Sequence, residues 1–147
     1  MGEFFLHEER STPVVLISGG VGVTPMMAML DHLLQQGSSR EIRFIHACRH
    51  GGTHAFKAHV AHLADEYPNL RAAVYYEHPR AQDRMGVDHD HAGRINLPAL
   101  GELFLLPEAD YYLCGPLPFM QTQAQSLQSL GVPMDRIPME VFGTGGV

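Results

Sequence analysis

Residues 14–27 read V-V-L-I-S-G-G-V-G-V-T-P-M-M, and this stretch decides the fold that we expect for the chain. Its first four residues form an apolar run rich in β-branched side chains, which is typical of a strand buried on both faces. Three glycines within residues 18–22 predict a tight turn. Thr24 and Pro25 then predict the start of a helix, with threonine as the N-cap and proline in the first helical position.

A strand, a glycine turn and a capped helix together direct backbone N–H groups and the positive end of the helix dipole toward one point, which suits a phosphate group. The run 20–25 is not the common G-x-G-x-x-G fingerprint, because Pro25 stands where the last glycine would fall. A βα turn whose glycines only let the chain reverse is the alternative interpretation.

The composition indicates one domain without a basic binding surface. The chain has 147 residues, of which 45% are hydrophobic, and this is enough for a single core. Its net charge is −6, and its one lysine and scattered arginines form no basic stripe, which argues against nucleic acid or an anionic membrane as a partner. The first residues lack the features of a signal peptide, and Cys48 and Cys114 are expected to be reduced, so we expect a cytoplasmic location.

The rest of the chain continues the alternation of strands and helices. Strands are predicted at residues 14–17, 42–48, 70–76, 111–114 and 136–142, and helices at 24–36, 53–67, 96–103 and 119–130. In the second helix Phe56, Val60 and Leu63 are spaced to share one buried face. A long polar loop, residues 77–93, follows the third strand. This order predicts an α/β fold, an open five-stranded parallel sheet with helices on both faces.

Right-handed crossovers place the turn after each parallel strand along one edge of the sheet, where the ligands of such sheets bind. Residues 20–25, 48–49, 77, 114–116 and 142 all belong to this carboxyl edge. The sequence therefore predicts that these positions converge.

Three motifs resemble those of the ferredoxin–NADP-reductase superfamily. They are residues 17–25 (I-S-G-G-V-G-V-T-P), residues 112–116 (Y-L-C-G-P) with Phe119 and Met120 after them, and residues 140–143 (E-V-F-G). Within that superfamily the chain most resembles the C-terminal NAD-binding domain of the flavohaemoglobins, the nitric oxide dioxygenases. Residues 2–6 resemble the end of the flavin domain that precedes it in that family, and residues 54–56 also fit.

The resemblance implies a ferredoxin-reductase-like NAD-binding domain over residues 13–143. Residues 1–12 would be the end of a flavin domain and a linker, and residues 144–147 a tail or linker. In the family a hydride passes from NADH or NADPH to FAD, and electrons then go to haem, which supports nitric oxide detoxification. No Arg-x-Tyr-Ser/Thr flavin motif is present, so the chain is expected to be a fragment of such an oxidoreductase, inactive without its FAD domain.

The resemblance also implies which residues contact the cofactors. The pyrophosphate and ribose would be held by Gly19, Gly20, Val21, Gly22, Val23, Thr24 and Pro25. Cys114, as a catalytic residue, would flank the nicotinamide with Gly115 and Pro116. Glu140, the second catalytic residue, would tune the redox potential of the flavin, and Val141, Phe142 and Gly143 would lie against its ring. Simple core packing for Cys114 and a surface position for Glu140 are the alternatives.

The residues after the third strand bear on the form of the dinucleotide. NADPH-using relatives usually carry a Ser-Arg pair there to hold the 2′-phosphate, whereas this chain has Glu77, His78 and Pro79. A carboxylate can accept hydrogen bonds from ribose hydroxyls and repels a phosphate, which favours NADH. Arg80 and Arg84 stand close enough in the sequence to leave NADPH open.

Two other functions stay open at this stage. The glycine-rich residues 143–146 would fit a linker from a reductase module to a [2Fe-2S] ferredoxin domain. A non-catalytic nucleotide-binding or regulatory module is the second alternative. No metal site is expected, because the run 88–91 (D-H-D-H) falls in a loop and no cysteine completes a tetrahedral site. His46 is expected to be a core histidine.

Overall fold

The computed structural model describes residue 6 and residues 10–141 of the chain. These residues form a parallel sheet with the strand order β4-β3-β2-β1-β5-β6. The strands are β1 (Val14–Gly19), β2 (Ile42–Cys48), β3 (Leu70–Tyr76), β4 (His91–Ala92), β5 (Asp110–Gly115) and β6 (Met139–Val141). The chain first adds strands on one side of β1 and then, from β5 onward, on the other. This reversal is the switch point of a doubly wound sheet.

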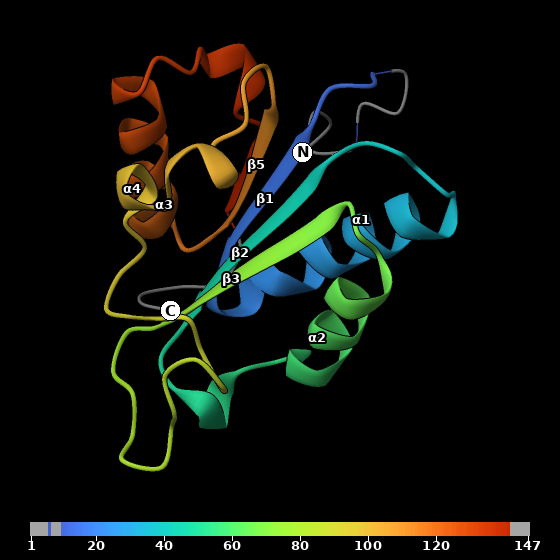
Figure 1. Cartoon of the computed structure of the whole chain (residues 1–147). Helices are drawn as coiled ribbons and strands as arrows, with labels where there is room; N and C mark the ends of the chain where they lie inside the picture. The colour runs from blue at the N-terminus through green and yellow to red at the C-terminus, as the bar shows by residue number, and fades with distance from the viewer. Residues whose placement is uncertain (1–5, 7–9, 142–147) are drawn as a thin grey trace.

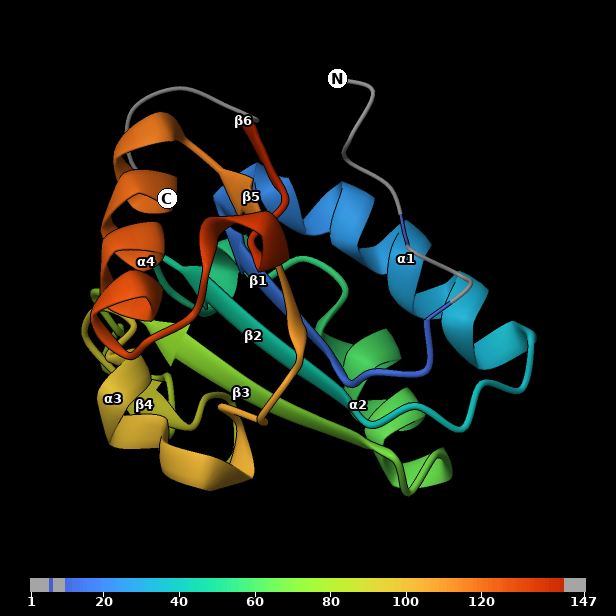
Figure 2. The same ribbon diagram turned by 90° about the horizontal axis from the view of Figure 1, so that it is seen from above.

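Helices cover both faces of the sheet, as Figures 1 and 2 show. α1 (Val23–Gln35) and α2 (Lys57–Glu66) lie on one face, and α3 (Leu97–Leu100) and α4 (Leu117–Ser129) lie on the other. Four short 3₁₀ turns complete the described part: η1 (Gly20–Gly22), η2 (Gly51–Thr53), η3 (Gly101–Leu103) and η4 (Met134–Arg136). The α/β fold with helices on both faces is therefore confirmed. Among the helices of residues 10–141, none has the length and apolar character needed to cross a membrane.

The central strands are buried along their whole length because both of their faces are covered. In β1, Val14 and Leu16 pack against α1 and α2, while Val15 and Ile17 pack on the side of α3 and α4. All four side chains are fully buried. The uninterrupted apolar run at the start of β1 thus reflects two cores, one on each side of the sheet.

The sheet has one strand more than the sequence predicts. β4 lies within the expected loop 77–93 and pairs with the end of β3. Its His91 ring stacks on Tyr75, with ring centroids 4.5 Å apart, and the backbone N–H of Val74 donates to Asp90 Oδ2 at 2.9 Å. These contacts come from side chains distant in sequence, which no local pattern reveals.

Two predicted elements are partly wrong. α2 begins at Lys57 and not near residue 53, because Phe56 adopts a left-handed conformation (φ 62°) that interrupts helical geometry. The Phe56 side chain is 43% exposed, so it does not share the buried face of Val60 and Leu63. The last strand is also shorter than predicted, since Met134–Arg136 form a 3₁₀ turn and β6 begins only at Met139.

A buried ion cluster fixes the segment before β1 to the start of β5. Asp110 is fully buried and lies 2.5 Å from Arg10 Nη1 and 3.6 Å from Arg40 Nη2. Thr12 donates its hydroxyl to the same carboxylate at 3.1 Å, and Arg40 Nε donates to the Thr12 carbonyl at 2.5 Å. The carboxylate therefore holds residues 10–12 against the sheet.

Replacing Asp110 with asparagine is expected to lower the free energy of unfolding by about 3 kcal/mol, because two arginines lose their buried counter-charge. Urea denaturation followed by circular dichroism measures this loss. Glu66→Gln is the control, since the Glu66 side chain is 54% exposed and pairs with the exposed His62, and it should change stability by less than about 0.5 kcal/mol. Equal stability of the two variants would contradict the role given to Asp110.

Candidate functional site

The turn after β1 is a 3₁₀ turn that leads directly into α1. Gly19 ends β1 in an extended conformation, and Gly20 reverses the chain with a left-handed φ of 57°. α1 begins at Val23 with Gly22 as its N-cap and without a side-chain cap, so the prediction that Thr24 caps the helix is wrong. The 3₁₀ turn begins at Gly20 and leads into α1, so the backbone N–H groups of Gly20 and Val21 lie at its N-terminal end. A phosphate would meet these amides and not a threonine cap.

A close backbone approach joins this turn to the end of β5. A Cβ placed on Gly22 would lie 2.5 Å from the carbonyl carbon of Cys114 and 2.8 Å from the nitrogen of Gly115. A Cβ on Gly115 would lie 3.2 Å from the Gly19 carbonyl oxygen. The turn at residues 19–22 and the turn at residues 114–116 are thus in contact, as the sequence predicts. Gly22 is required by this packing, whatever it does toward a ligand.

Cys114 and Glu140 lie side by side on neighbouring strands. They are register partners in the parallel pair β5–β6, and Glu140 is half-buried. Cys114 is fully buried, and this burial, with a smaller contribution from the charge of Glu140, raises the pKa of the thiol to about 12. The thiol is therefore neutral, which fits a packing role and not a nucleophile.

The remaining predicted contacts at this edge lie around the same two turns. Thr24 is exposed and Pro25 half-buried in the first turn of α1, and Pro116 is the N-cap of α4. Val141, at the end of β6, is 53% exposed and is the register partner of Gly115. Phe142 and Gly143, together with segments 1–5, 7–9 and 144–147, lie outside the described residues.

Glu77 occupies the same edge at a distance from Cys114. It follows β3, and its backbone N–H donates to the Cys48 carbonyl at 2.9 Å. β3 lies three strand positions from β5 in the sheet, which at about 4.8 Å per strand is a separation of about 14 Å. The predicted site residues therefore form a row along the carboxyl edge, with Glu77 toward one end and Glu140 at the other.

A buried network of histidines lies under this edge on the α1–α2 face, and sequence reasoning missed most of it. Ser18 Oγ and His46 Nδ1 are 2.8 Å apart, and His54 Nδ1 hydrogen bonds to Tyr76 Oη at 2.6 Å. The Tyr76 ring stacks on His89, with centroids 4.4 Å apart. Of these residues only His46 was predicted, as a core histidine, and its burial confirms that interpretation. The signal for it was the position of His46 inside the predicted buried strand 42–48.

Two histidines of this network, His46 and His54, are neutral at pH 7 in the folded protein. Burial, reinforced by the neighbouring His54, lowers the pKa of His46 to about 3. Burial, followed by the charge of Lys57, lowers the pKa of His54 to about 4. The run 88–91 serves packing here: Asp88 pairs with Lys57, and His89 and His91 stack on tyrosines. Within the described residues no three His, Cys, Asp or Glu side chains are arranged to hold a metal.

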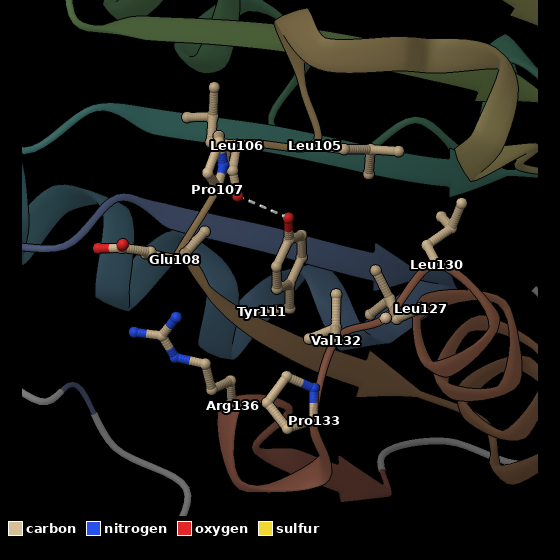
Figure 3. Close-up of a pocket in the computed structure, with 12 residues that line it drawn as sticks. Leu105, Leu106, Pro107, Glu108, Tyr111, Leu127, Leu130, Val132, Pro133 and Arg136 are labelled. Atoms are coloured by element: carbon tan, nitrogen blue, oxygen red, sulfur yellow. Dashed lines mark hydrogen bonds between the residues drawn. The ribbon is translucent and has the colours of Figure 1, made fainter.

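A cavity of about 280 Å³ lies elsewhere, near the start of β5 and the end of α4 (Figure 3). Tyr111 stands in its middle and donates its hydroxyl to the Leu106 carbonyl at 2.8 Å. No residue predicted for the site lines this cavity. It belongs to the opposite edge of the sheet from the glycine turn.

Comparison with known proteins identifies close relatives of the chain. Residues 16–125 match the family model described as "Oxidoreductase NAD-binding domain". The flavohemoprotein of Bordetella pertussis is 57% identical over 146 residues, which cover 99% of this chain and 36% of that protein. The chain thus spans about a third of the length of the curated relatives it matches.

The chain is also similar to solved structures of flavohaemoglobin-type proteins. The "Flavohem-like-FAD/NAD Binding Domain of Nitric Oxide Dioxygenase" from Vibrio cholerae is 38% identical, with a TM-score of 0.77 over 95% of this chain and 54% of that one. A flavohemoglobin from Malassezia yamatoensis "with bound FAD and heme" is 30% identical, with a TM-score of 0.76 over 90% of this chain and 32% of that one.

Gly22→Ala is expected to lower the free energy of unfolding by about 1–3 kcal/mol, because the new methyl group would press on the backbone of β5. Urea denaturation measures the change. The control is Val21→Ala in the same turn, where the side chain is 58% exposed, and its effect should stay within about 0.5 kcal/mol. A Gly22→Ala variant as stable as the parent would show that η1 and β5 are not in tight contact.

The protein is expected to lose stability as the pH falls below 6.5, because His46 is neutral when folded, with a pKa of about 3, and takes up a proton only on unfolding. This stability is complete above pH 6.5 and is lost toward the folded pKa, at about 1.4 kcal/mol per pH unit from His46. His46→Gln should flatten the dependence between about pH 4 and 6, as measured by urea denaturation at each pH. His62→Gln, at a side chain 72% exposed, should leave the slope unchanged, and equal slopes for both variants would refute the assignment.

Proposed function

We propose that this chain, which belongs to the family of oxidoreductase NAD-binding domains, is the NADH-binding part of a flavin-dependent reductase of the flavohaemoglobin type. The observation that carries the proposal is the contact between η1 and the end of β5, where Gly22 lies against Cys114. It joins a turn suited to a pyrophosphate with a strand end suited to a nicotinamide ring. Residues 13–143 would form this NAD-binding domain, with residues 1–12 and 144–147 as its connections.

The pyrophosphate would bind at residues 19–25. The backbone N–H groups of Gly20 and Val21 lie at the N-terminal end of η1, which continues into α1, so they are placed where the positive end of the helix dipole favours an anion. Val21 and Thr24 are exposed, and no ionised acidic side chain lies in the first turn of α1 to oppose an anion. These residues fit the group.

When bound, NADH supplies a hydride and FAD accepts it, and the chain places the two reacting rings. Cys114, Gly115 and Pro116 would flank the nicotinamide. The neutral thiol of Cys114 offers an uncharged surface there, while the half-buried carboxylate of Glu140 would supply negative charge beside the flavin. Val141, Phe142 and Gly143 would contact the flavin ring.

The FAD would be held by a domain outside these 147 residues. The relatives support this proposal, because the matched Vibrio cholerae chain is named an FAD/NAD-binding domain and extends well beyond the matched part. An apolar groove beside the end of β6, lined in part by Leu117, Met139 and Val141, supports a neighbouring domain at this place. These three side chains are between 37% and 53% exposed. Electrons would pass from FAD to haem, as the names of the flavohemoprotein relatives suggest.

The dinucleotide would be NADH in preference to NADPH. Glu77 stands at the end of β3, where its carboxylate can accept hydrogen bonds from ribose hydroxyls and repel a 2′-phosphate.

Val21→Asp tests the proposed site. The new carboxylate would face the pyrophosphate from an exposed position and is expected to raise the dissociation constant for NADH about tenfold, which is about 1.4 kcal/mol. Calorimetry measures NADH binding to the chain, and stopped-flow absorbance measures flavin reduction by NADH after the chain is mixed with a separately expressed FAD domain. Flavin reduction should slow in the variant at low NADH.

Val21→Asn is the matched control, because asparagine has nearly the same shape as aspartate but no charge. This variant should bind NADH as the parent does. A parent chain that binds NADH but does not support reduction of the flavin would favour a regulatory module over a reductase. A parent chain that binds no NADH would overturn the proposed function.

A further inference from the structure

The loop after β3 folds back onto the turn after β2 through one carboxylate, that of Asp83. Its side chain is only 4% exposed. Asp83 Oδ2 accepts from the backbone N–H of Arg80 at 2.8 Å and from the backbone N–H of Gly51, in η2, at 3.2 Å. Asp83 thus ties two carboxyl-edge turns together, although they lie 32 residues apart in sequence.

The same carboxylate binds the guanidinium group of Arg80 on two sides. Arg80 Nη2 donates to Oδ1 at 3.0 Å, and Arg80 Nε donates to Oδ2 at 3.3 Å. The guanidinium lies over the η2 turn: a Cβ on Gly51 would stand 2.9 Å from Nη2, and one on Gly52 would stand 3.1 Å from Nη1. This arrangement holds the pKa of Asp83 well below its usual range, chiefly through the hydrogen bond from Arg80.

The pair lies where the adenosine half of a dinucleotide is expected. In doubly wound sheets the ribose next to adenine lies at the strand ends that follow the phosphate-binding turn, where an acidic residue accepts from the 2′-hydroxyl or an arginine holds the 2′-phosphate. β2 and β3 end here, and beyond them the N–H of His78 donates to the Arg49 carbonyl at 2.8 Å. Glu77 and Arg80 are therefore candidates to meet the same ribose.

We propose that Asp83 determines the preference for NADH by holding Arg80, so that its guanidinium does not pair with a 2′-phosphate. To bind NADPH through Arg80, the protein would have to break a two-point charged contact and leave a nearly buried carboxylate beside a dianion. Both effects oppose NADPH and leave NADH untouched. The inference rests on the proposed function, because it concerns the specificity of the same dinucleotide site.

Two further arginines make the inference specific. Arg49, directly after β2, and Arg84, beyond Asp83, are both exposed, so cations are available near this edge besides Arg80. If Asp83 acts only by repelling phosphate, its removal would help NADPH whichever arginine remains. If it acts through Arg80, the benefit requires Arg80.

The test is Asp83→Asn, with NADH and NADPH titrated separately into the chain by calorimetry. Asparagine keeps an oxygen for the N–H groups of Gly51 and Arg80 but loses the charge that holds the guanidinium. The dissociation constant for NADPH is expected to fall about tenfold, as expected for one new charged contact, and that for NADH to change less than about twofold. In Asp83→Asn/Arg80→Ala the gain should disappear, whereas in Asp83→Asn/Arg49→Ala it should persist.

The double variant Asp83→Asn/Arg80→Ala, compared with the parent chain, provides a second test. It removes both charges of the pair, the held guanidinium and the carboxylate that holds it, so it should leave the ratio of NADH to NADPH affinities unchanged. Weaker NADPH binding in this double variant than in the parent would overturn the inference, because Arg80 would then already contact the phosphate in the parent chain. A folded Asp83→Asn variant with parent affinity for both nucleotides would also overturn it, while the proposed function would stand. A parent chain that binds neither nucleotide would overturn the proposed function itself.

Discussion

The site depends on a backbone contact that only glycine permits. η1 passes so close to the end of β5 that a Cβ on Gly22 would stand 2.8 Å from the Gly115 nitrogen. The amides of one turn and the strand end of the other are therefore positioned by main-chain atoms, without intervening side chains that could change rotamer. Reactions that need two rings in near-contact require such fixed placement, because small displacements of the reacting groups cost rate. The same contact brings the turn after β1 against the end of β5, at the point where the strand order of the sheet reverses.

The electrostatics of the carboxyl edge follow from which groups are buried. Burial keeps His46 neutral, with a pKa of about 3, and keeps the Cys114 thiol neutral, with a pKa of about 12. Neither group adds a charge beneath η1, so the oriented amides and the helix dipole set the local potential. The charges of Glu77, Asp83 and Glu140 stand farther along the edge. An anionic pyrophosphate is thus favoured at the centre of the row of site residues along the carboxyl edge, while the carboxylates place negative charge at the two ends of that row.

Local patterns predicted the parts of this site that local physics determines. The apolar run of β1 and the glycines after it predicted strand and turn, since burial on both faces and chain reversal each leave a composition signal. The helix start was misplaced because sequence rules favour a side-chain cap such as Thr24, whereas the chain begins its helical turn at Gly20 without one. Phe56 shows the same limit: no local rule places a phenylalanine in a left-handed conformation, and only its tertiary surroundings can hold it there.

The ion-pair partner of a charged side chain was the hardest property to predict from the sequence. From its place after β3, Arg80 could be identified as a candidate to bind a 2′-phosphate. The sequence did not reveal that its guanidinium already pairs with Asp83. Asp83 is only three residues away, yet in a loop this spacing does not imply contact as it would on a helix. The decisive group is Gly51, which comes from another turn and helps to bury the Asp83 carboxylate. A carboxylate shielded in this way binds its cation more strongly than an exposed one, since water competes less for both partners. Two chains with identical arginines at this edge can therefore differ in the dinucleotide they prefer, because preference depends on which of those arginines is already paired.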